Sequence, residues 1–366
     1  MKQNRIHNFA AGPAALPESV LEQVRDELMN YKGSGVSVME MSHRSKAFDE
    51  IMANTKKAVK DLMALGDDHE ILFLQGGASL QFSMVPMNLA QKGKPIDVIH
   101  SGYWTEMAIK QLKGYEHRIV ASSEKDGFKK LPMVHSDMFN PNASYTYICT
   151  NNTIYGTQWK DIPDTGSAPL VADMSSDILS RRRDFKKYGL IFAGAQKNLG
   201  PSGVCLVVIR KDLAERADAN LPTMLQYRTH VKGDSRYNTP PAFGIYVCGL
   251  VLDWIQKQGG LEAIEKTNET KAKLLYDAID SSSFYMSPLE KTHRSSMNVV
   301  FRVKPDSADS ETLEDTFVKE AKAVGLTELK GHRAIGGLRA SIYNAMSVES
   351  VKILVDFMKA FEKKHG

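Results

Sequence analysis

Two charged residues near the middle of the chain stand in contexts that suit chemistry. Asp173 ends the apolar run Pro169–Asp173, and Lys197 follows the apolar run Leu190–Ala193 behind the uncharged residues Gly194–Gln196. A lysine against an apolar wall loses proton affinity, and its neutral amine becomes a usable nucleophile. In a parallel or mixed sheet both residues would face one cleft. Taken singly, such a lysine is also typical of a solvated surface, and such an aspartate of a turn.

An amine and a carboxylate that share one cleft are what pyridoxal phosphate requires. A lysine forms a Schiff base with this cofactor, and a carboxylate keeps its pyridine nitrogen protonated so that the ring accepts electrons. The combination of Lys197 with Asp173 therefore predicts a site for pyridoxal phosphate.

A candidate phosphate-binding turn follows the apolar run Glu70–Leu74. Gly76-Gly77 come next, and Ala78-Ser79 open a helical stretch. Backbone N–H groups at a helix N-terminus and the Ser79 hydroxyl can bind an anion, although a glycine pair before a helix is also typical of a plain turn. The chain contains neither the dinucleotide fingerprint nor G-x-x-x-x-G-K-S/T, which disfavours a nucleotide. Trp104 begins the helix after the next strand, where its ring would either stack on a pyridine or fill the core.

Basic residues that could bind anions gather at two further places. His43-Arg44 precede Ser45, the expected N-cap of a helix, while His332, Arg333 and Arg339 fall within eight residues that include no acidic residue. Arginine binds carboxylate and phosphate through paired, charge-assisted hydrogen bonds. The alternative interpretations are a solvated loop and a charge at a helix start.

Short apolar runs and helical stretches alternate through most of the chain. After expected helices at Pro17–Tyr31 and Ser45–Leu65, the runs that read as buried strands are Glu70–Leu74, Ile96–His100, Tyr145–Thr150, Pro169–Asp173, Leu190–Ala193 and Val204–Ile209. This alternation predicts an α/β fold: a large, mostly parallel, seven-stranded type of sheet flanked by helices, with its site at the carboxyl ends of the strands.

The pattern changes near Gly259-Gly260. The elements expected beyond that point are a helix at Leu261–Ser281, an edge strand at Met297–Val303, a helix at Glu311–Val324, a strand at Gly337–Tyr343 and a helix at Val348–Lys363. This is an α+β pattern. It predicts a small domain made of residues 1–15 and 260–366 beside a large domain made of residues 16–259.

Composition excludes several classes of protein. The 366 residues are 42% hydrophobic and 25% charged, as in ordinary globular chains. A net charge of +4 without a solid Lys/Arg block disfavours nucleic acid as a partner. No run approaches 18 apolar residues and the N-terminus lacks the apolar stretch of a signal peptide, so we expect no membrane span. Cys149, Cys205 and Cys248 lie far apart in apolar runs, which predicts buried thiols, no disulfide or metal site, and a cytoplasmic protein.

Several motifs follow one another along nearly the whole chain. They are Asn8–Ala14, Ser42–Ser45, Gln75–Ser79, Asn151–Thr157, Ala172–Ser176, Ala195–Asn198, Tyr237–Pro241, Gly331–Arg333 and Gly336–Asn344. Together they resemble the phosphoserine aminotransferases, a family of fold-type-I pyridoxal phosphate enzymes in the class V aminotransferase group. Some relatives carry an arginine after the glycine pair, where this chain has Ala78-Ser79.

The resemblance implies a role for each matching position. Lys197 would bind the cofactor and move a proton, Asp173 would pair with the pyridine nitrogen, and Trp104 would stack on the ring. The residues that would bind the cofactor's phosphate or 3-oxygen are Ala78, Ser79, Gln196 and Thr153, with Asn238 and Thr239 reaching in from the partner in a homodimer. The residues that would bind substrate are Arg339 at its carboxylate, and His43, Arg44, His332 and Arg333 at a phosphate or distal carboxylate.

The reaction implied is transfer of an amino group from L-glutamate to 3-phosphohydroxypyruvate, which gives O-phospho-L-serine and 2-oxoglutarate in serine biosynthesis. Amination of a related phosphorylated four-carbon acid in pyridoxine biosynthesis stays open. Three alternatives stand beside this reading. They are serine–pyruvate or alanine–glyoxylate transfer, whose substrates lack a second anion; a cysteine desulfurase, which needs a reactive loop cysteine; and a non-catalytic protein that kept the fold.

Overall fold

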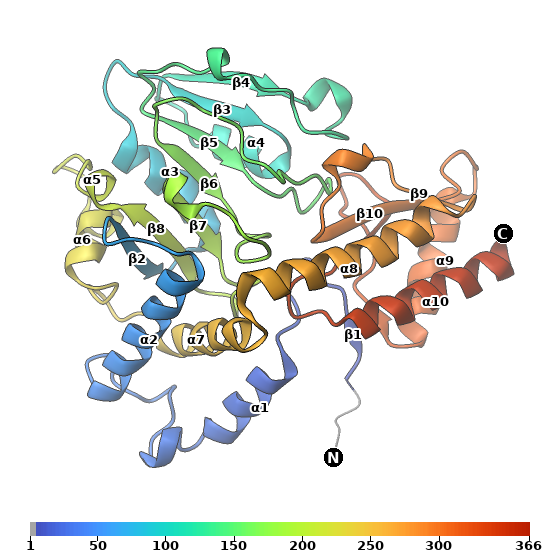
Figure 1. Ribbon diagram of the computed structural model, residues 1–366, viewed down its shortest axis with the longest axis horizontal. Coiled ribbons are helices and arrows are strands. Elements are labelled where there is room, and N and C mark those ends of the chain that lie inside the picture. Colours follow the sequence, from blue (N-terminus) through green and yellow to red (C-terminus); the bar gives the residue numbers. More distant parts are fainter. Residues whose placement is uncertain (1–4) are drawn as a thin grey trace.

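The computed structural model describes residues 5–366. Figure 1 shows a large sheet with helices on both faces and, beside it, a smaller layer of strands and helices, with α8 (Gly260–Asp280) running from one part to the other. Residues 1–4, which the sequence analysis grouped with the small domain, lie outside the described residues.

The large sheet has seven strands. Their order is β2 (His69–Leu74), β8 (Cys205–Arg210), β7 (Tyr188–Gly194), β6 (Leu170–Asp173), β5 (Tyr145–Cys149), β3 (Ile96–His100) and β4 (His117–Ser122). Neighbours from β7 to β4 are parallel, whereas β8 is antiparallel to both β7 and β2. β2 therefore points the same way as β7. The prediction of a mostly parallel sheet is confirmed.

Helices cover both faces of this sheet. In addition to α8, the helices of the large and the smaller part are α1 (Glu18–Glu27), α2 (Lys46–Leu62), α3 (Gly77–Leu89), α4 (Tyr103–Lys110), α5 (Lys211–Ala214), α6 (Tyr227–Lys232), α7 (Ala242–Lys257), α9 (Ser310–Ala323) and α10 (Val348–His365). Successive strand residues point to opposite faces, so in β6 Ala172 packs in the cluster with α2 and α7, while Val171 packs in the cluster with α3 and α4. Because helices cover both faces, these strands are apolar runs buried on both sides, as expected for a covered parallel sheet.

The first two helices follow the sequence pattern at their starts more closely than at their ends. The Ser45 hydroxyl accepts a hydrogen bond from the Phe48 amide and caps α2, as predicted. α1 ends at Glu27 rather than at Tyr31. Beyond it, Tyr31–Gly33 form a separate turn in which Lys32 has a left-handed φ of 47°, and such a residue cannot continue a helix.

The smaller part contains two short sheets. An antiparallel one has the order β12 (Leu338–Ser341), β10 (Asn298–Val303) and β9 (Tyr285–Met286), and a parallel pair joins β1 (His7–Asn8) to β11 (Leu326–Thr327). The expectation of an edge strand at Met297–Val303 is wrong, because β10 lies between two partners. Its residues are buried except for Arg302, as a central strand under helices requires.

One helix contributes to the hydrophobic cores of both parts. In α8, Leu261 and Ile264 belong to the cluster formed with α2 and α7, whereas Ala272, Leu275 and Ile279 belong to the cluster of the smaller part. The domain boundary at residues 259–260 stays a prediction, since the helix that begins there packs on both sides of it.

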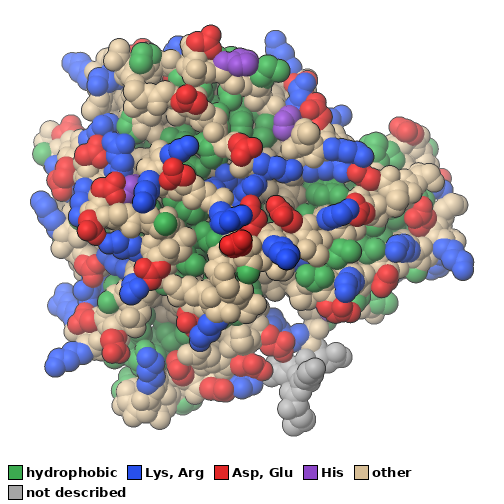
Figure 2. All heavy atoms as spheres, in the orientation of Figure 1, with side chains coloured by type: hydrophobic (Ala, Val, Ile, Leu, Met, Phe, Trp, Pro, Cys, Tyr) green, Lys and Arg blue, Asp and Glu red, His purple; other side chains and the backbone are tan. Residues whose placement is uncertain are grey.

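The surface carries charges of both signs. Figure 2 shows Lys and Arg side chains interspersed with Asp and Glu over the visible face. Between residues 5 and 366 we find no helix with the length and apolar character that crossing a membrane requires.

Candidate active site

The carboxyl ends of β2, β3, β5, β6 and β7 meet at one edge of the large sheet, because these strands point the same way. Asp173 ends β6, Lys197 lies in the turn after β7, and Thr153 follows β5. A cavity of about 320 Å³ opens at this edge. Its volume falls within the ~300–1,000 Å³ that small-molecule sites occupy.

The cavity collects most of the residues that the sequence predicts as a site. Those that line it are Ala78, Ser79, Trp104, Thr153, Asp173, Gln196, Lys197, His332 and Arg339. Lining residues for which the sequence analysis predicted no role are Ala11, Gly12, Gly77, Ile154 and Ser175. All five lie within the quoted motifs, so the signal that could have found them was present.

Lys197 presents its amine to the cavity. Its Nζ donates a hydrogen bond of 2.9 Å to Thr153 Oγ1 and lies 5.4 Å from the centroid of the Trp104 ring. Burial lowers the pKa of Lys197, while the negative charge of Asp173 opposes that shift. The amine therefore loses its proton more readily than a surface lysine, as a nucleophile or base requires.

Asp173 is buried and held in one orientation. Its Oδ1 accepts a hydrogen bond of 2.8 Å from the Ser175 amide. The Ser175 hydroxyl in turn accepts one of 3.1 Å from the Gly194 amide at the end of β7. Burial raises the pKa of Asp173, while Lys197 and Ser175 act in the opposite direction. A cation placed against this carboxylate would favour its charged form.

The N-terminus of α3 offers donors for an anion. Gly76 has a left-handed φ of 84°, and a Cβ there would lie 2.5 Å from Leu80 Cδ2, so the turn requires glycine. In the part of the chain that the structure describes, the backbone N–H groups of Gly77, Ala78 and Ser79 donate to no acceptor. These groups point outward from the positive end of the helix dipole and fit a phosphate.

Two basic side chains of the smaller part complete the cavity wall. Arg339, in β12, donates a hydrogen bond of 3.1 Å from one guanidinium nitrogen to the Thr153 carbonyl, and burial lowers its pKa. The His332 ring lies 5.8 Å from the ring of Tyr103, and burial together with Arg339 and Arg333 lowers its pKa. Within residues 5–366 no carboxylate pairs with Arg339 or His332. The charge of Arg339 and a hydrogen-bonding ring nitrogen of His332 are therefore available to an anionic substrate.

Five predicted site residues do not line this cavity. They are His43, Arg44, Asn238, Thr239 and Arg333. The His43 carbonyl accepts a 3.5 Å hydrogen bond from Arg236, Asn238 Nδ2 donates one of 2.7 Å to Gln75 Oε1, and Arg333 is exposed beside His332. Their proposed roles stay predictions.

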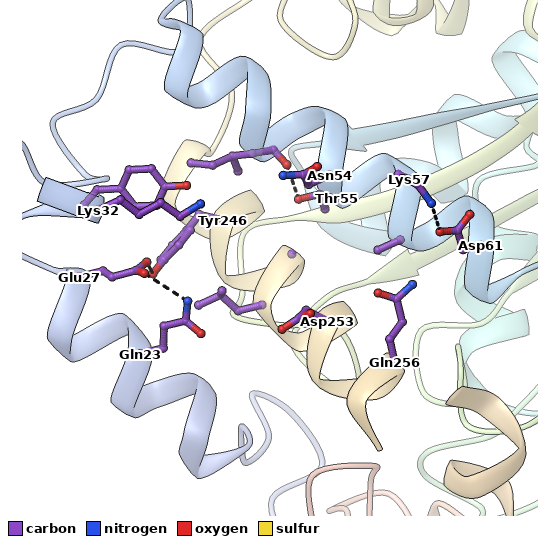
Figure 3. A pocket seen from close by; sticks show the side chains of 15 residues that line it. Gln23, Glu27, Lys32, Asn54, Thr55, Lys57, Asp61, Tyr246, Asp253 and Gln256 are labelled. Atoms are coloured by element: carbon purple, nitrogen blue, oxygen red, sulfur yellow. Dashed lines mark hydrogen bonds and ion pairs between the residues drawn. The ribbon is translucent and has the colours of Figure 1, made fainter. Parts of the chain in front are cut away.

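A cavity of about 390 Å³ between α1, α2 and α7 has different chemistry (Figure 3). Most of its charged groups already have partners: the Tyr246 hydroxyl donates to Glu27, and Lys57 pairs with Asp61 four residues on. No lysine in its lining lies near a buried carboxylate in the manner of Lys197 and Asp173. Size alone therefore does not identify the site.

The cysteines are buried free thiols, as predicted. Burial raises the pKa of Cys149, Cys205 and Cys248. A raised pKa keeps a thiol protonated and unreactive, which argues against a desulfurase.

The residues of the Lys197 cavity fit pyridoxal phosphate. They provide an amine of lowered proton affinity, a buried carboxylate, and unpaired backbone donors for a phosphate. The indole Nε1 of Trp104, whose ring faces the amine, is buried without a hydrogen-bond partner in the described structure. Asp173 ends β6, Lys197 follows the neighbouring parallel strand β7, and both side chains line the cavity.

Known proteins share both the sequence and the fold. Residues 6–354 match the family described as Aminotransferase class-V. The phosphoserine aminotransferase of Desulfatibacillum aliphaticivorans is 53% identical, with full coverage of both chains. A solved phosphoserine aminotransferase from Bacillus circulans subsp. alkalophilus superimposes with a TM-score of 0.95 at 46% identity over both full chains. One from Trichomonas vaginalis, described as PLP bound, gives 0.89 at 38% identity over 97% of this chain and 100% of that one. The chain therefore belongs to the class-V aminotransferases, in the family of the phosphoserine aminotransferases.

Proposed function

We propose that this chain transfers an amino group from L-glutamate to 3-phosphohydroxypyruvate, with pyridoxal phosphate as cofactor, and so forms O-phospho-L-serine and 2-oxoglutarate. The observation that carries the proposal is a single cavity in which Lys197 and Asp173 meet two basic side chains that lack carboxylate partners. Full-length similarity to phosphoserine aminotransferases supports the choice of substrates.

Each lining residue has a separate proposed role toward the cofactor. Lys197 would hold the cofactor covalently and, once released from it, would accept and return the proton at the α-carbon of the substrate. Asp173 is the negative partner for the pyridine nitrogen, and the N–H groups of Gly77, Ala78 and Ser79 bind the phosphate. When bound, the cofactor supplies an electron-accepting ring that weakens the bonds of the α-carbon.

The basic wall suits both substrates of the proposed reaction. Glutamate and 3-phosphohydroxypyruvate each carry a carboxylate beside the reacting carbon and a second anion further away. Arg339 binds the first through paired hydrogen bonds. His332 at the cavity edge and exposed Arg333 beside it bind the second. Alanine and pyruvate have no second anion and would leave these groups unused.

A homodimer is part of the proposal. In their own chain, Asn238 and Thr239 lie beside Gln75, and His43 lies beside Arg236, all outside the cavity. We infer that these residues, with Arg44, complete the cavity of a second copy. Analytical ultracentrifugation of the purified protein measures its molecular mass in solution and distinguishes a monomer from a dimer. A monomer with full activity would contradict the proposal.

The test of the reaction is a coupled assay. With glutamate as donor, turnover per KM should be about 10- to 100-fold higher for 3-phosphohydroxypyruvate than for pyruvate or glyoxylate, since a charge-assisted hydrogen bond contributes about 1.5–3 kcal/mol. The double variant His332→Gln/Arg333→Gln should lose about tenfold with the phosphorylated substrate and little with pyruvate. Equal rates with all three acceptors would contradict the proposal.

A further inference from the structure

A segment near the N-terminus, Phe9–Ala14, crosses from the smaller part to the cavity; we call it the N-terminal strap. At one end, Phe9 is fully buried in the core of the smaller part, and its amide donates to the Thr327 carbonyl at 3.1 Å. At the other end, the Ala14 amide donates to the Gln196 carbonyl at 2.8 Å, one residue from Lys197. Between these ends, Ala11 and Gly12 line the cavity.

The middle of the strap lies directly on the side chain of Lys197. A Cβ at Gly12 would lie 3.2 Å from Lys197 Cγ and 3.7 Å from Cε, and Gly12 has a φ of +135°. The contact is close, and the φ of Gly12 is one that residues with a Cβ rarely adopt, so the backbone here favours glycine. The strap is thus one wall of the space in which the Lys197 amine stands.

A single side chain fastens that wall. The Tyr343 hydroxyl donates a hydrogen bond of 2.8 Å to the Ala11 carbonyl. Throughout residues 5–366 we find no other hydrogen bond to the backbone of residues 11–13. Gly12 and Pro13 are exposed, so among the described residues the Tyr343 hydroxyl supplies the hydrogen bond that holds the middle of the strap.

The Tyr343 hydroxyl belongs to a buried hydrogen-bond network. Asn298 Nδ2 donates to the Tyr343 hydroxyl at 3.1 Å, and Asn298 Oδ1 accepts from Asn151 Nδ2 at 2.8 Å. The Ala11 carbonyl can only accept, so the hydroxyl donates its proton to Ala11 while its oxygen accepts from the Asn298 amide group. Tyr343 is 2% exposed, and burial raises its pKa to about 12, so the hydroxyl stays a donor at neutral pH.

We propose that Tyr343 is a positioning residue whose hydroxyl fastens the N-terminal strap over Lys197 and keeps that side of the cavity closed. Asn151 lies just beyond β5 in the large sheet, whereas Tyr343 follows β12 in the smaller part. The network therefore joins the strap to both parts of the molecule. Its effect on catalysis rests on the proposed function; the fastening itself does not.

The experiment compares Tyr343→Phe with Tyr285→Phe in the full-length protein. Tyr285 is the matched control, since its buried hydroxyl also donates to a carbonyl, that of Met358, at 2.9 Å, but away from the cavity. Hydrogen exchange is followed by mass spectrometry with and without added pyridoxal phosphate. In Tyr343→Phe, exchange of the Ala14 amide should rise about two- to tenfold, the factor that one hydrogen bond contributes. The Phe9 amide should stay protected, and Tyr285→Phe should leave both unchanged.

A kinetic measurement separates positioning from a loss of stability. When a binding-competent state is less populated, apparent affinity falls in proportion. Tyr343→Phe should therefore raise KM for glutamate by a factor similar to the exchange effect with kcat within about twofold, whereas Tyr285→Phe should change neither. Gly12→Ala, which forces the strap away from Lys197 with Tyr343 intact, should reproduce the rise in Ala14 exchange.

Two outcomes would overturn the inference: unchanged Ala14 exchange in Tyr343→Phe, or equal changes in Tyr343→Phe and Tyr285→Phe. If the wild-type protein shows no aminotransferase activity while Ala14 exchange rises in Tyr343→Phe alone, the proposed function fails and the fastening of the strap stands.

Discussion

Lys197 and Lys271 are both lysines whose pKa burial lowers, yet their surroundings differ. Lys271 lies on α8 with no exposed surface, and its Nζ donates to the carbonyls of Ile342 at 3.0 Å and Tyr343 at 2.7 Å. Lys197 instead faces a cavity that also holds Asp173. Burial makes both amines easier to deprotonate, but only Lys197 has room beside it for another molecule. A lowered lysine pKa therefore indicates burial only, whereas a cavity beside the amine indicates a functional site.

The largest expected effect separates the two lysines by activity. Lys197→Ala should reduce turnover by about 10⁴-fold or more, because the group that holds the cofactor and moves the proton is gone. It should also abolish the visible absorbance of the protein loaded with pyridoxal phosphate. Lys271→Met should keep that absorbance. A yellow, active Lys197→Ala protein would end the assignment.

The next largest effect is on the pH dependence of stability, which Lys271 should influence. Burial lowers the pKa of Lys271 to about 7, whereas an unfolded lysine titrates near 10.4. Between these values the unfolded chain binds more protons than the folded one, so the contribution of Lys271 to the free energy of unfolding rises with pH and is least favourable below pH 7. At about 1.4 kcal/mol per pKa unit, wild type should gain about 4 kcal/mol relative to Lys271→Met between pH 7 and 10.

Urea unfolding at the two pH values measures this difference. Lys273→Met is the control, because Lys273 is an exposed lysine on the same helix. Its unfolding free energy should follow that of wild type at both pH values. If the unfolding free energy of Lys271→Met changed with pH in the same way as that of wild type, Lys271 would be charged in the folded state at pH 7 and above.

A smaller effect tests the basic wall of the Lys197 cavity. Among the described residues Arg339 has no carboxylate partner, whereas the buried Arg183 side chain pairs with Asp177 at 2.9 Å. Arg339→Gln should raise KM for both glutamate and 3-phosphohydroxypyruvate about 10- to 100-fold, the factor for hydrogen bonds to a charged group. Arg339→Lys should recover only part of this loss, since lysine cannot form the paired contact. Unchanged KM values in Arg339→Gln would place substrate elsewhere.

Sequence patterns predicted those parts of the fold in which burial is uniform. The strands β3, β5, β6 and β7 are apolar throughout and buried on both faces, so their runs stood out. β4 was missed because most of its residues are exposed at the sheet edge, and its sequence, HRIVAS, is half polar. The position of β10 between two partners was also missed, since pairing depends on segments far away in the chain.

The same distinction holds for the site. Lys197 and Asp173 could be paired from sequence because each follows a strand of a parallel sheet, and that topology alone brings them to one edge. Arg339 and His332 were named from a local cluster of basic residues and from the resemblance, but their position beside Lys197 depends on contacts between segments far apart in the chain, which local patterns do not encode. Ser175 was passed over because its backbone N–H orients Asp173, and every residue type except proline supplies such a donor.

The helix α8 has a consequence for how the chain unfolds. Its first turns complete one apolar core and its last turns the other, so neither core is whole without it. A cut between Gly259 and Gly260 would leave the larger fragment without Leu261 and Ile264, and the smaller one with those side chains in water. We therefore expect a single cooperative denaturation transition for the intact polypeptide, and no autonomous folding of either fragment.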